Sequence, residues 1–197
     1  MEPVVYTVLQ ADPLPEGARR RLLACLPPVR RARLAPGRPE RWDQALLAWG
    51  LLAWAARRHW GEFPAVAVEP GGRPWFPDRP AWRFSLSHTA GGAACALWDR
   101  PVGVDLEGPR RVSPRLLAAL DAGDPAEFLR RWTCREAAWK RLGRGGVRTL
   151  LTPAPGEEGC RVFPLEGGTL LAVAAEGAEA PVSVALETLL TELPAEG

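Results

Sequence analysis

Residues 124–143 have the sequence DPAEFLRRWTCREAAWKRLG, which predicts a helix with a defined start and a defined end. Asp124 is suited to cap the N-terminus, Pro125 is favoured in a first turn, and Glu127 follows the cap at the spacing of a capping box. Gly143 is suited to end the helix, because glycine readily adopts the left-handed conformation that follows a last helical turn. The segment therefore predicts one long helix in the second half of the chain.

The predicted helix carries a carboxylate within its apolar face. At about 100° per residue, one stripe of the helix gathers Phe128, Leu129, Trp132 and Trp139. Glu136 falls inside this stripe and Lys140 lies at its edge, one turn later. A carboxylate on a core-facing stripe must be paired, hydrogen-bonded or bound to a metal, because unpaired burial is costly. Two interpretations stay open: a partly buried ion pair, or part of a functional site.

Lys140 is the only lysine among the 25 lysine and arginine residues of the chain. An ammonium is a compact, rotatable donor with a tunable pKa, and these properties suit it to a position among phosphate oxygens. An ordinary (i, i+4) pair with Glu136 would instead contribute only about 0.2–0.5 kcal/mol to helix stability. Considered without the rest of the chain, Lys140 could form a surface ion pair or could contact a phosphate.

A strand with two acidic residues is predicted at Val102–Glu107, where apolar and acidic residues alternate. On a strand, Asp105 and Glu107 point to the same face, about 7 Å apart along the chain. Adjacent anions repel unless a cation lies between them, and Mg²⁺ prefers carboxylate and water oxygens. The alternative to a metal site is a strand face that is simply exposed to solvent. The presence of Glu136 as a third carboxylate makes this alternative weaker.

The segment Phe84–His88 offers a further candidate site. Ser87 and His88 are neighbours on a predicted strand, so they face opposite ways and do not form a hydrolase dyad. His88 lies on the face of Phe84 and Leu86, where it would either bind an anion or serve a structural role.

The composition excludes several classes of protein. A hydrophobic content of 47% with nine tryptophans predicts a packed globule, and a net charge of +2 gives no overall field for nucleic acid. The four cysteines, without a CxxC pair, favour free thiols in a reducing cytosol over a zinc site. The N-terminus lacks a signal-peptide pattern, and the apolar run from Ala45 to Ala56 is shorter than the roughly 20 residues of a membrane span. We expect a soluble, cytoplasmic protein and a buried helix at this run.

The order of elements predicts two similar α+β halves, residues 1–100 and 101–197, with the metal site in the second. The predicted helices are Glu16–Leu26 and Pro39–His59, joined by an arginine-rich connection, Pro27–Pro39. A turn is predicted at Gly71–Pro74. The predicted strands, besides Val102–Glu107, are Val4–Leu9, Trp82–Leu86, Ala93–Trp98, Arg161–Phe163, Thr169–Ala174 and Val182–Ala185.

Three segments in this order resemble the motifs of the 4′-phosphopantetheinyl transferases of the surfactin-synthetase-activating type. They are Phe84–His88, Gly103–Glu107 and Trp132–Lys140, with Gly72-Arg73-Pro74 where the family usually has Gly-Lys-Pro and with trailing glycines at Gly143 and Gly145. The likeness runs through about residues 70–150. It implies two similar α+β subdomains, related by a pseudo-two-fold axis, with coenzyme A bound in the cleft between them.

The resemblance also implies a reaction and a set of site residues. A Mg²⁺-dependent enzyme of this type, including the holo-acyl-carrier-protein synthases, transfers 4′-phosphopantetheine from coenzyme A to a serine of an apo acyl or peptidyl carrier protein, releasing adenosine 3′,5′-bisphosphate. The implied metal ligands are Asp105, Glu107 and Glu136, and the implied catalytic residues are Glu136 as base and Lys140. The implied coenzyme A contacts are Arg73, Ser87, His88, Asp105, Lys140 and Arg41. No nucleic acid or membrane is implied, and two halves in one chain make a monomer sufficient.

Two departures from the family pattern keep alternatives open. Gln44 stands where the family usually has an arginine that contacts the 3′-phosphate, so Arg41 or Arg38 would have to replace it. The interval from Glu107 to Glu136 is short for this family. The resemblance implies that this region helps to form the surface that binds the carrier protein, so the identity of the carrier stays open. A degenerate relative that binds coenzyme A without transfer is the second hypothesis. An arginine-rich nucleic-acid module is the third, and the near-neutral charge opposes it.

Overall fold

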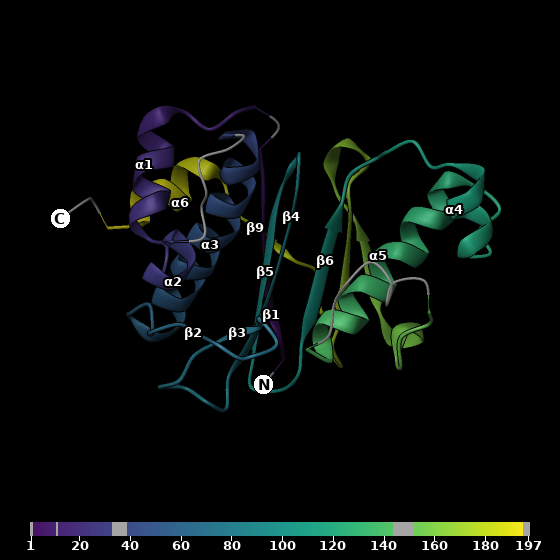
Figure 1. The fold of residues 1–197 in the computed structure, drawn as a ribbon. Helices are drawn as coiled ribbons and strands as arrows, with labels where there is room; N and C mark the ends of the chain where they lie inside the picture. Colours follow the sequence, from purple (N-terminus) through teal and green to yellow (C-terminus); the bar gives the residue numbers. More distant parts are fainter. Residues whose placement is uncertain (1, 11, 33–38, 144–151, 195–197) are drawn as a thin grey trace.

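The computed structural model describes residues 2–10, 12–32, 39–143 and 152–194. These residues form a mixed α+β fold in which helices, a sheet, a second sheet and further helices follow one another as layers (Figure 1). None of the helices in these ranges combines the length and the apolar character needed to cross a membrane.

The first sheet has the strand order β4-β5-β1-β9. Its strands are β1 (Val4–Leu9), β4 (Arg83–Thr89), β5 (Gly92–Trp98) and β9 (Val182–Ser183). Pairing is antiparallel between β4, β5 and β1, whereas β9 pairs with β1 in parallel. The predicted strands are confirmed, and β4 extends through Thr89, so that Ser87 and His88 belong to the sheet.

A separate hairpin contains the predicted turn at residues 71–74. Strands β2 (Ala67–Val68) and β3 (Pro74–Trp75) pair with each other, and the Gly72 N–H donates to the Glu69 carbonyl at 2.8 Å. Arg73 belongs to this turn, and its guanidinium lies near Gly143, just beyond the end of α5.

Helices cover one face of the first sheet. They are α1 (Glu16–Ala24), α3 (Pro39–Trp60) and α6 (Leu186–Glu192), with the short α2 (Pro28–Arg31) in the arginine-rich connection (Figure 1). Residues 46–56 of α3 are all buried, because α1 and α6 pack on the side of α3 that the sheet leaves open. The prediction that this apolar run is a buried helix is confirmed.

The second sheet has the order β6-β8-β7, and helix α5 covers its outer face. Its strands are β6 (Gly103–Glu107), β7 (Arg161–Pro164) and β8 (Leu170–Ala174). Helix α5 spans Pro125–Arg141, and the short α4 (Pro114–Ala119) precedes it. Asp124 Oδ1 accepts the Glu127 N–H at 2.8 Å, as predicted, but the Glu127 carboxylate accepts from the Gly123 N–H rather than from that of Asp124.

The two sheets pack against each other through β5, which is buried on both faces. Ala93, Cys95 and Leu97 pack toward the helices, while Ala94, Ala96 and Trp98 pack toward the second sheet. The small side chains of Ala94 and Ala96 let the two sheets approach closely. This double burial explains why β5 is apolar along its whole length.

Strands β4 and β6 lie side by side where the two sheets meet (Figure 1). The Ser85 hydroxyl accepts the Val104 N–H at 3.0 Å, and the Ser87 hydroxyl accepts the Leu106 N–H at 3.1 Å. Serine side chains thus occupy the positions that a backbone carbonyl would take in a continuous sheet.

The chain returns to the first layer after β8. Strand β9 pairs with β1, and Leu189 within α6 and Leu193 just beyond its end join the core around α3. The division into residues 1–100 and 101–197 stays a prediction, but the segment 182–193 of the second range lies with the first sheet. Long-range pairing of a two-residue strand leaves no periodic signal in the sequence.

Gly103 is expected to be essential for the contact between β6 and α5. A Cβ atom at this position would lie 1.9 Å from the Ala137 carbonyl oxygen and 2.5 Å from the Arg141 nitrogen. Because both atoms belong to the helix backbone, Gly103→Ala should lower the free energy of unfolding by about 1–3 kcal/mol or more. Denaturant titration measures the change. The control is Gly17→Ala in α1, where a Cβ meets nothing within 4 Å and the effect should stay within about 1 kcal/mol; equal losses in both variants would contradict the close approach.

Candidate active site

Three carboxylates gather where β6 faces α5. Val104 and Leu106 pack into the core between the sheets, so Asp105 and Glu107 face the helix, from which Glu136 reaches toward them. One oxygen atom from each of the three lies within 4.8 Å of the others. The structure therefore brings together the three carboxylates that the sequence singled out, and their role as metal ligands stays a prediction.

Lys140 is held by three oxygen atoms beside this cluster. Its Nζ donates to Asp105 Oδ1 at 2.7 Å and to Ser87 Oγ at 3.1 Å, and it lies 3.3 Å from Glu136 Oε1. The side chain is 25% exposed, whereas that of Asp105 is 3% exposed. The ion pair with Glu136 that the sequence predicts is present, and Asp105 is the closer partner.

The hydroxyl of Ser87 is fully used by contacts within the chain. It donates to Asp105 Oδ1 at 2.8 Å and accepts from the Leu106 N–H and from Lys140 Nζ. One donor and two acceptor positions exhaust the capacity of a hydroxyl group. The assignment of Ser87 to a bound nucleotide stays a prediction; in the protein alone the side chain orients Asp105 and Lys140.

The second carboxylate oxygen of Asp105 fits a bound cation. Asp105 Oδ2 is buried and has no hydrogen-bond partner among the described residues. An orphaned buried carboxylate oxygen is costly, and two further carboxylates nearby supply the all-oxygen set that Mg²⁺ prefers. The donor set and this orphaned atom are therefore compatible with a hard divalent cation.

Burial and the neighbouring charges shift the pKa values of Glu107 and Glu136. Burial and the Asp105 charge raise the pKa of Glu136, and the Lys140 ammonium only partly offsets them. Burial, followed by the charge of Asp105, also raises the pKa of Glu107. For Lys140, burial by itself would lower the pKa, but the Asp105 and Glu136 carboxylates outweigh it and the pKa is raised. Negative charge thus exceeds positive charge at this site.

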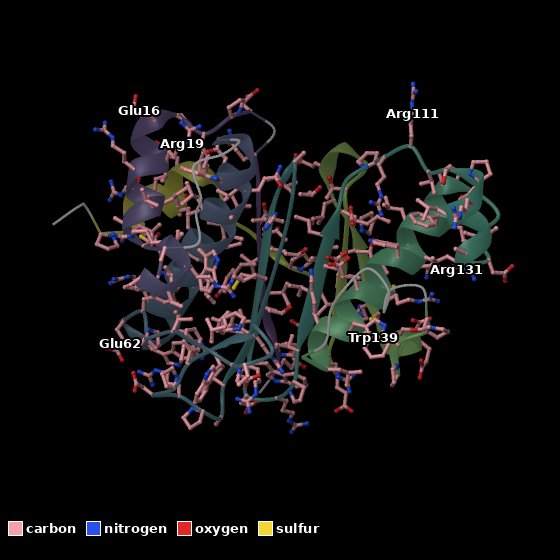
Figure 2. All side chains as sticks on the ribbon, viewed as in Figure 1. Glu16, Arg19, Glu62, Arg111, Arg131 and Trp139 are labelled. Carbon is pink, nitrogen blue, oxygen red and sulfur yellow. The ribbon has the colours of Figure 1, made fainter. Side chains whose placement is uncertain are left out.

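Trp132 and Arg110 support Glu107 from the side of α5. Trp132 Nε1 donates to Glu107 Oε1 at 3.0 Å, and the Arg110 guanidinium lies over the Trp132 ring, 3.7 Å from the same oxygen. The next residue, Arg111, points away from the molecule (Figure 2). Trp132 was recognised in the sequence only as part of an apolar stripe, and nothing in the sequence signalled Arg110.

A cavity of about 370 Å³ opens between the first layer and the end of α5. Its lining includes Arg73, His88 and Lys140, three of the residues that the sequence assigned to coenzyme A. Arg30 and Trp49 line it as well, with the Arg30 guanidinium 5.3 Å from the centre of the Trp49 ring. The arginine-rich connection signalled positive charge at residue 30, but only the tertiary structure places that charge at this cavity.

His88 forms part of the cavity wall at the end of β4. Loss of hydration, followed by the Lys140 charge, lowers the pKa of His88. With Lys140, Arg73 and Arg30 around the same cavity, the local charge favours an anionic ligand.

Gln44, which stands at the position of the family's 3′-phosphate arginine, does not line this cavity. Gln44 lines a separate cavity of about 160 Å³ near Thr89 and Gly92. Arg41 lies within α3, but its side chain is outside the description, and Arg38 falls outside the described residues. The substitution of either arginine for the missing one stays a prediction.

Glu107→Gln should change how the stability of the metal-free protein depends on pH. Because folding raises the pKa of Glu107 above 4.5, the native state retains this proton longer, and wild-type stability falls as pH rises from that value through the raised pKa. The glutamine side chain of the variant cannot ionise, and its amide oxygen can still accept the hydrogen bond from Trp132 Nε1. Its gain in unfolding free energy over the wild type should therefore grow across this window and level off above it. Denaturant titrations in a chelator measure this, with the exposed Glu158→Gln as control; a gain that shrinks with rising pH would contradict the repulsion.

Comparisons with known proteins agree with the motifs. No protein-family model matches the chain. A 4′-phosphopantetheinyl transferase of Bacillus subtilis is 27% identical over 158 residues, covering 72% of this chain and 70% of the relative. The 4′-phosphopantetheinyl transferase Sfp of Bacillus subtilis strain 168 is 28% identical over 87 residues, covering 38% of this chain and 39% of the relative. The chain is therefore similar in sequence to 4′-phosphopantetheinyl transferases over about 72% of its length.

Proposed function

We propose that this protein transfers 4′-phosphopantetheine from coenzyme A to a serine hydroxyl of an apo acyl or peptidyl carrier protein. The observation that carries the proposal is the position of Lys140, which joins the three-carboxylate cluster to the cation-lined cavity. The names of the two relatives support the same transfer reaction. Within the superfamily we assign the chain to the Sfp type, with the holo-acyl-carrier-protein synthase activity as its reaction.

The cavity is the proposed seat of the nucleotide part of coenzyme A. Arg30, Arg73 and His88 offer donors to phosphate oxygens, and Trp49 and Phe84 offer apolar walls. The phosphates at the Lys140 end of the cavity would then face the carboxylate cluster. One ligand, coenzyme A, would then lie between the positively charged lining of the cavity and the negatively charged carboxylate cluster.

Asp105, Glu107 and Glu136 are the proposed ligands of Mg²⁺. The orphaned Asp105 Oδ2 and the raised pKa values of the two glutamates support this assignment. When bound, Mg²⁺ supplies neutralisation of the charge on the diphosphate of coenzyme A. These carboxylates would hold the cation next to Lys140, at one end of the cavity.

Glu136 is the proposed base. Burial and the Asp105 charge raise its pKa, so it holds a proton more strongly than an ordinary glutamate. It would take the proton of the carrier serine, directly or through a water, as the serine oxygen forms a bond to the β-phosphorus of coenzyme A. The bond from that phosphorus to the bridging oxygen breaks, and adenosine 3′,5′-bisphosphate leaves. Lys140 donates to the phosphate oxygens on which negative charge gathers.

The two-subdomain arrangement belongs to the same proposal. We assign residues 1–100 and 101–197 to two similar subdomains with a pseudo-two-fold relation, with the coenzyme A cleft between them and with residues 182–193 returning to the first subdomain. The cavity supports this, because β3, β4 and the end of α5 all contribute to its lining. A monomer in the cytoplasm is the proposed working form, because one chain then supplies every site residue.

A coenzyme A-binding protein without transferase activity is the alternative. The short interval between Glu107 and Glu136 and the glutamine at position 44 favour it. The complete set of Asp105, Glu136 and Lys140 in contact favours the enzyme. Calorimetry that detects tight coenzyme A binding by a protein without turnover would select the alternative.

Incubation with coenzyme A, Mg²⁺ and a panel of apo carrier domains should add one phosphopantetheine group to the serine of at least one carrier. Intact-protein mass spectrometry measures the added group. Glu136→Gln should slow transfer by about 10²–10⁴-fold, because a general base typically contributes that much. Glu158→Gln, at an exposed carboxylate, should leave the rate unchanged. No transfer by the folded wild type to any carrier would overturn the proposal.

Lys140→Arg should slow transfer by at least about tenfold although it keeps the charge, because a planar guanidinium cannot replace a compact ammonium among three oxygens. Initial rates at saturating coenzyme A measure the effect. The matched control is Arg130→Lys, the reverse exchange at an exposed position of the same helix, which should keep full activity. Equal rates for wild type and Lys140→Arg would show that only the charge matters.

A further inference from the structure

Two cysteines meet on the side of α5 that carries no proposed site residue. Cys134 belongs to α5, and Cys160 follows the short 3-10 helix Glu157–Gly159 and directly precedes β7. The Cys160 thiol donates to the Cys134 carbonyl oxygen at 3.3 Å, and the side chains of the two cysteines interact with each other. Residues 26 positions apart in the sequence thus bring their thiol groups to the same side of α5.

Both thiols are accessible from solvent. Cys134 and Cys160 are half-buried and line a cavity of about 540 Å³. The other two cysteines are in different surroundings: Cys95 is fully buried within β5, and the Cys25 thiol, at the end of α1, donates to the Arg21 carbonyl. Access and mutual contact therefore distinguish this pair from the remaining thiols.

The segments that carry the two thiols are fixed relative to each other. The buried Arg135 guanidinium donates to both carboxylate oxygens of Glu157, at 3.0 and 3.2 Å, and Glu157 Oε2 also accepts the Ala154 N–H. This ion pair binds the 3-10 helix to α5 next to Cys134. A fixed, adjacent thiol has a high effective concentration toward its neighbour, which favours ring closure over a lasting adduct with a small molecule.

Charged residues of both signs line this cavity. The arginines Arg130, Arg131 (Figure 2) and Arg135 are matched by the glutamates Glu127, Glu157 and Glu158. Because the positive and negative charges are equal in number, the lining does not repel a reagent that carries both carboxylates and ammonium groups.

We propose that Cys134 and Cys160 are an oxidisable dithiol that a low-molecular-weight disulfide, such as glutathione disulfide, converts into an intramolecular disulfide. One protein thiolate attacks the reagent, a mixed disulfide forms, and one glutathione leaves as a thiol. The second protein thiolate then attacks the mixed disulfide, the Cys134–Cys160 bond forms and the second glutathione leaves. The protein loses two protons and two electrons, which together are two hydrogen atoms, and the reagent gains them.

The disulfide would join α5 covalently to the segment that enters β7. A cross-link between distant residues restricts the unfolded chain, so the oxidised protein should unfold at a higher temperature. Cys134 lies two residues before Glu136, on a different face of the helix. The modification is therefore separate from the carboxylate cluster, and its detection does not depend on the proposed transferase activity.

Treatment of the folded protein with glutathione disulfide tests the proposal. Intact mass should fall by two hydrogen atoms, and peptide mapping without reduction should recover a Cys134–Cys160 cross-link. The midpoint of thermal unfolding should rise by several degrees and return to its starting value after dithiothreitol. Because the mapping uses the wild-type chain, its outcome does not depend on whether a cysteine variant folds.

Cysteine variants identify the residues responsible. Cys134→Ser and Cys160→Ala should each lose both the mass change and the thermal shift, while Cys25→Ser, the matched control at another half-buried thiol, should keep both. Stable glutathione adducts without ring closure would overturn the proposal. A cross-link through Cys25 or Cys95, or an unchanged mass under conditions that oxidise a reference dithiol, would overturn it as well.

Discussion

The buried ion pair between Lys140 and Asp105 is the interaction on which the arrangement of the site depends. It joins α5 to β6, and the Ser87 hydroxyl extends it to β4, so one ammonium fixes three elements from both layers. Removing the ammonium would leave a nearly fully buried carboxylate unpaired, which is far more costly than losing a surface pair. The positive charges of Lys140 and Arg110 are nevertheless fewer than the three carboxylates that they face. The excess of negative charge is what gives the site its capacity for a cation.

Close packing is what makes this ion pair possible. Gly103 lets the backbone of α5 approach β6 at Ala137, and Ala172 and Ala174 of β8 lie under the same helix. On the other side of the second sheet, small residues of β5 let the first sheet approach. Larger side chains at these positions would separate the layers by more than a hydrogen-bond length, and the carboxylates of β6 would no longer reach Lys140.

Helix α5 serves different purposes on its different faces. One face presents Glu136 and Lys140 to the carboxylates of β6 and to the cavity, and another presents Cys134 to Cys160. The buried Arg135 binds the segment before β7 to the same helix. Since every one of these contacts depends on the position of α5, a change in its packing would act on the proposed active site and on the dithiol together.

The sequence by itself determined the elements and the acidic residues, whereas the tertiary structure decided which cations meet them. Alternation in β6 predicted a face with Asp105 and Glu107, and the caps of α5 predicted its ends, because periodicity and capping are local properties of the chain. The place of Arg30 over Trp49, the saturation of the Ser87 hydroxyl and the pairing of β9 with β1 were not predicted. Each of these depends on residues far apart in the sequence, and such contacts are fixed only when the layers pack.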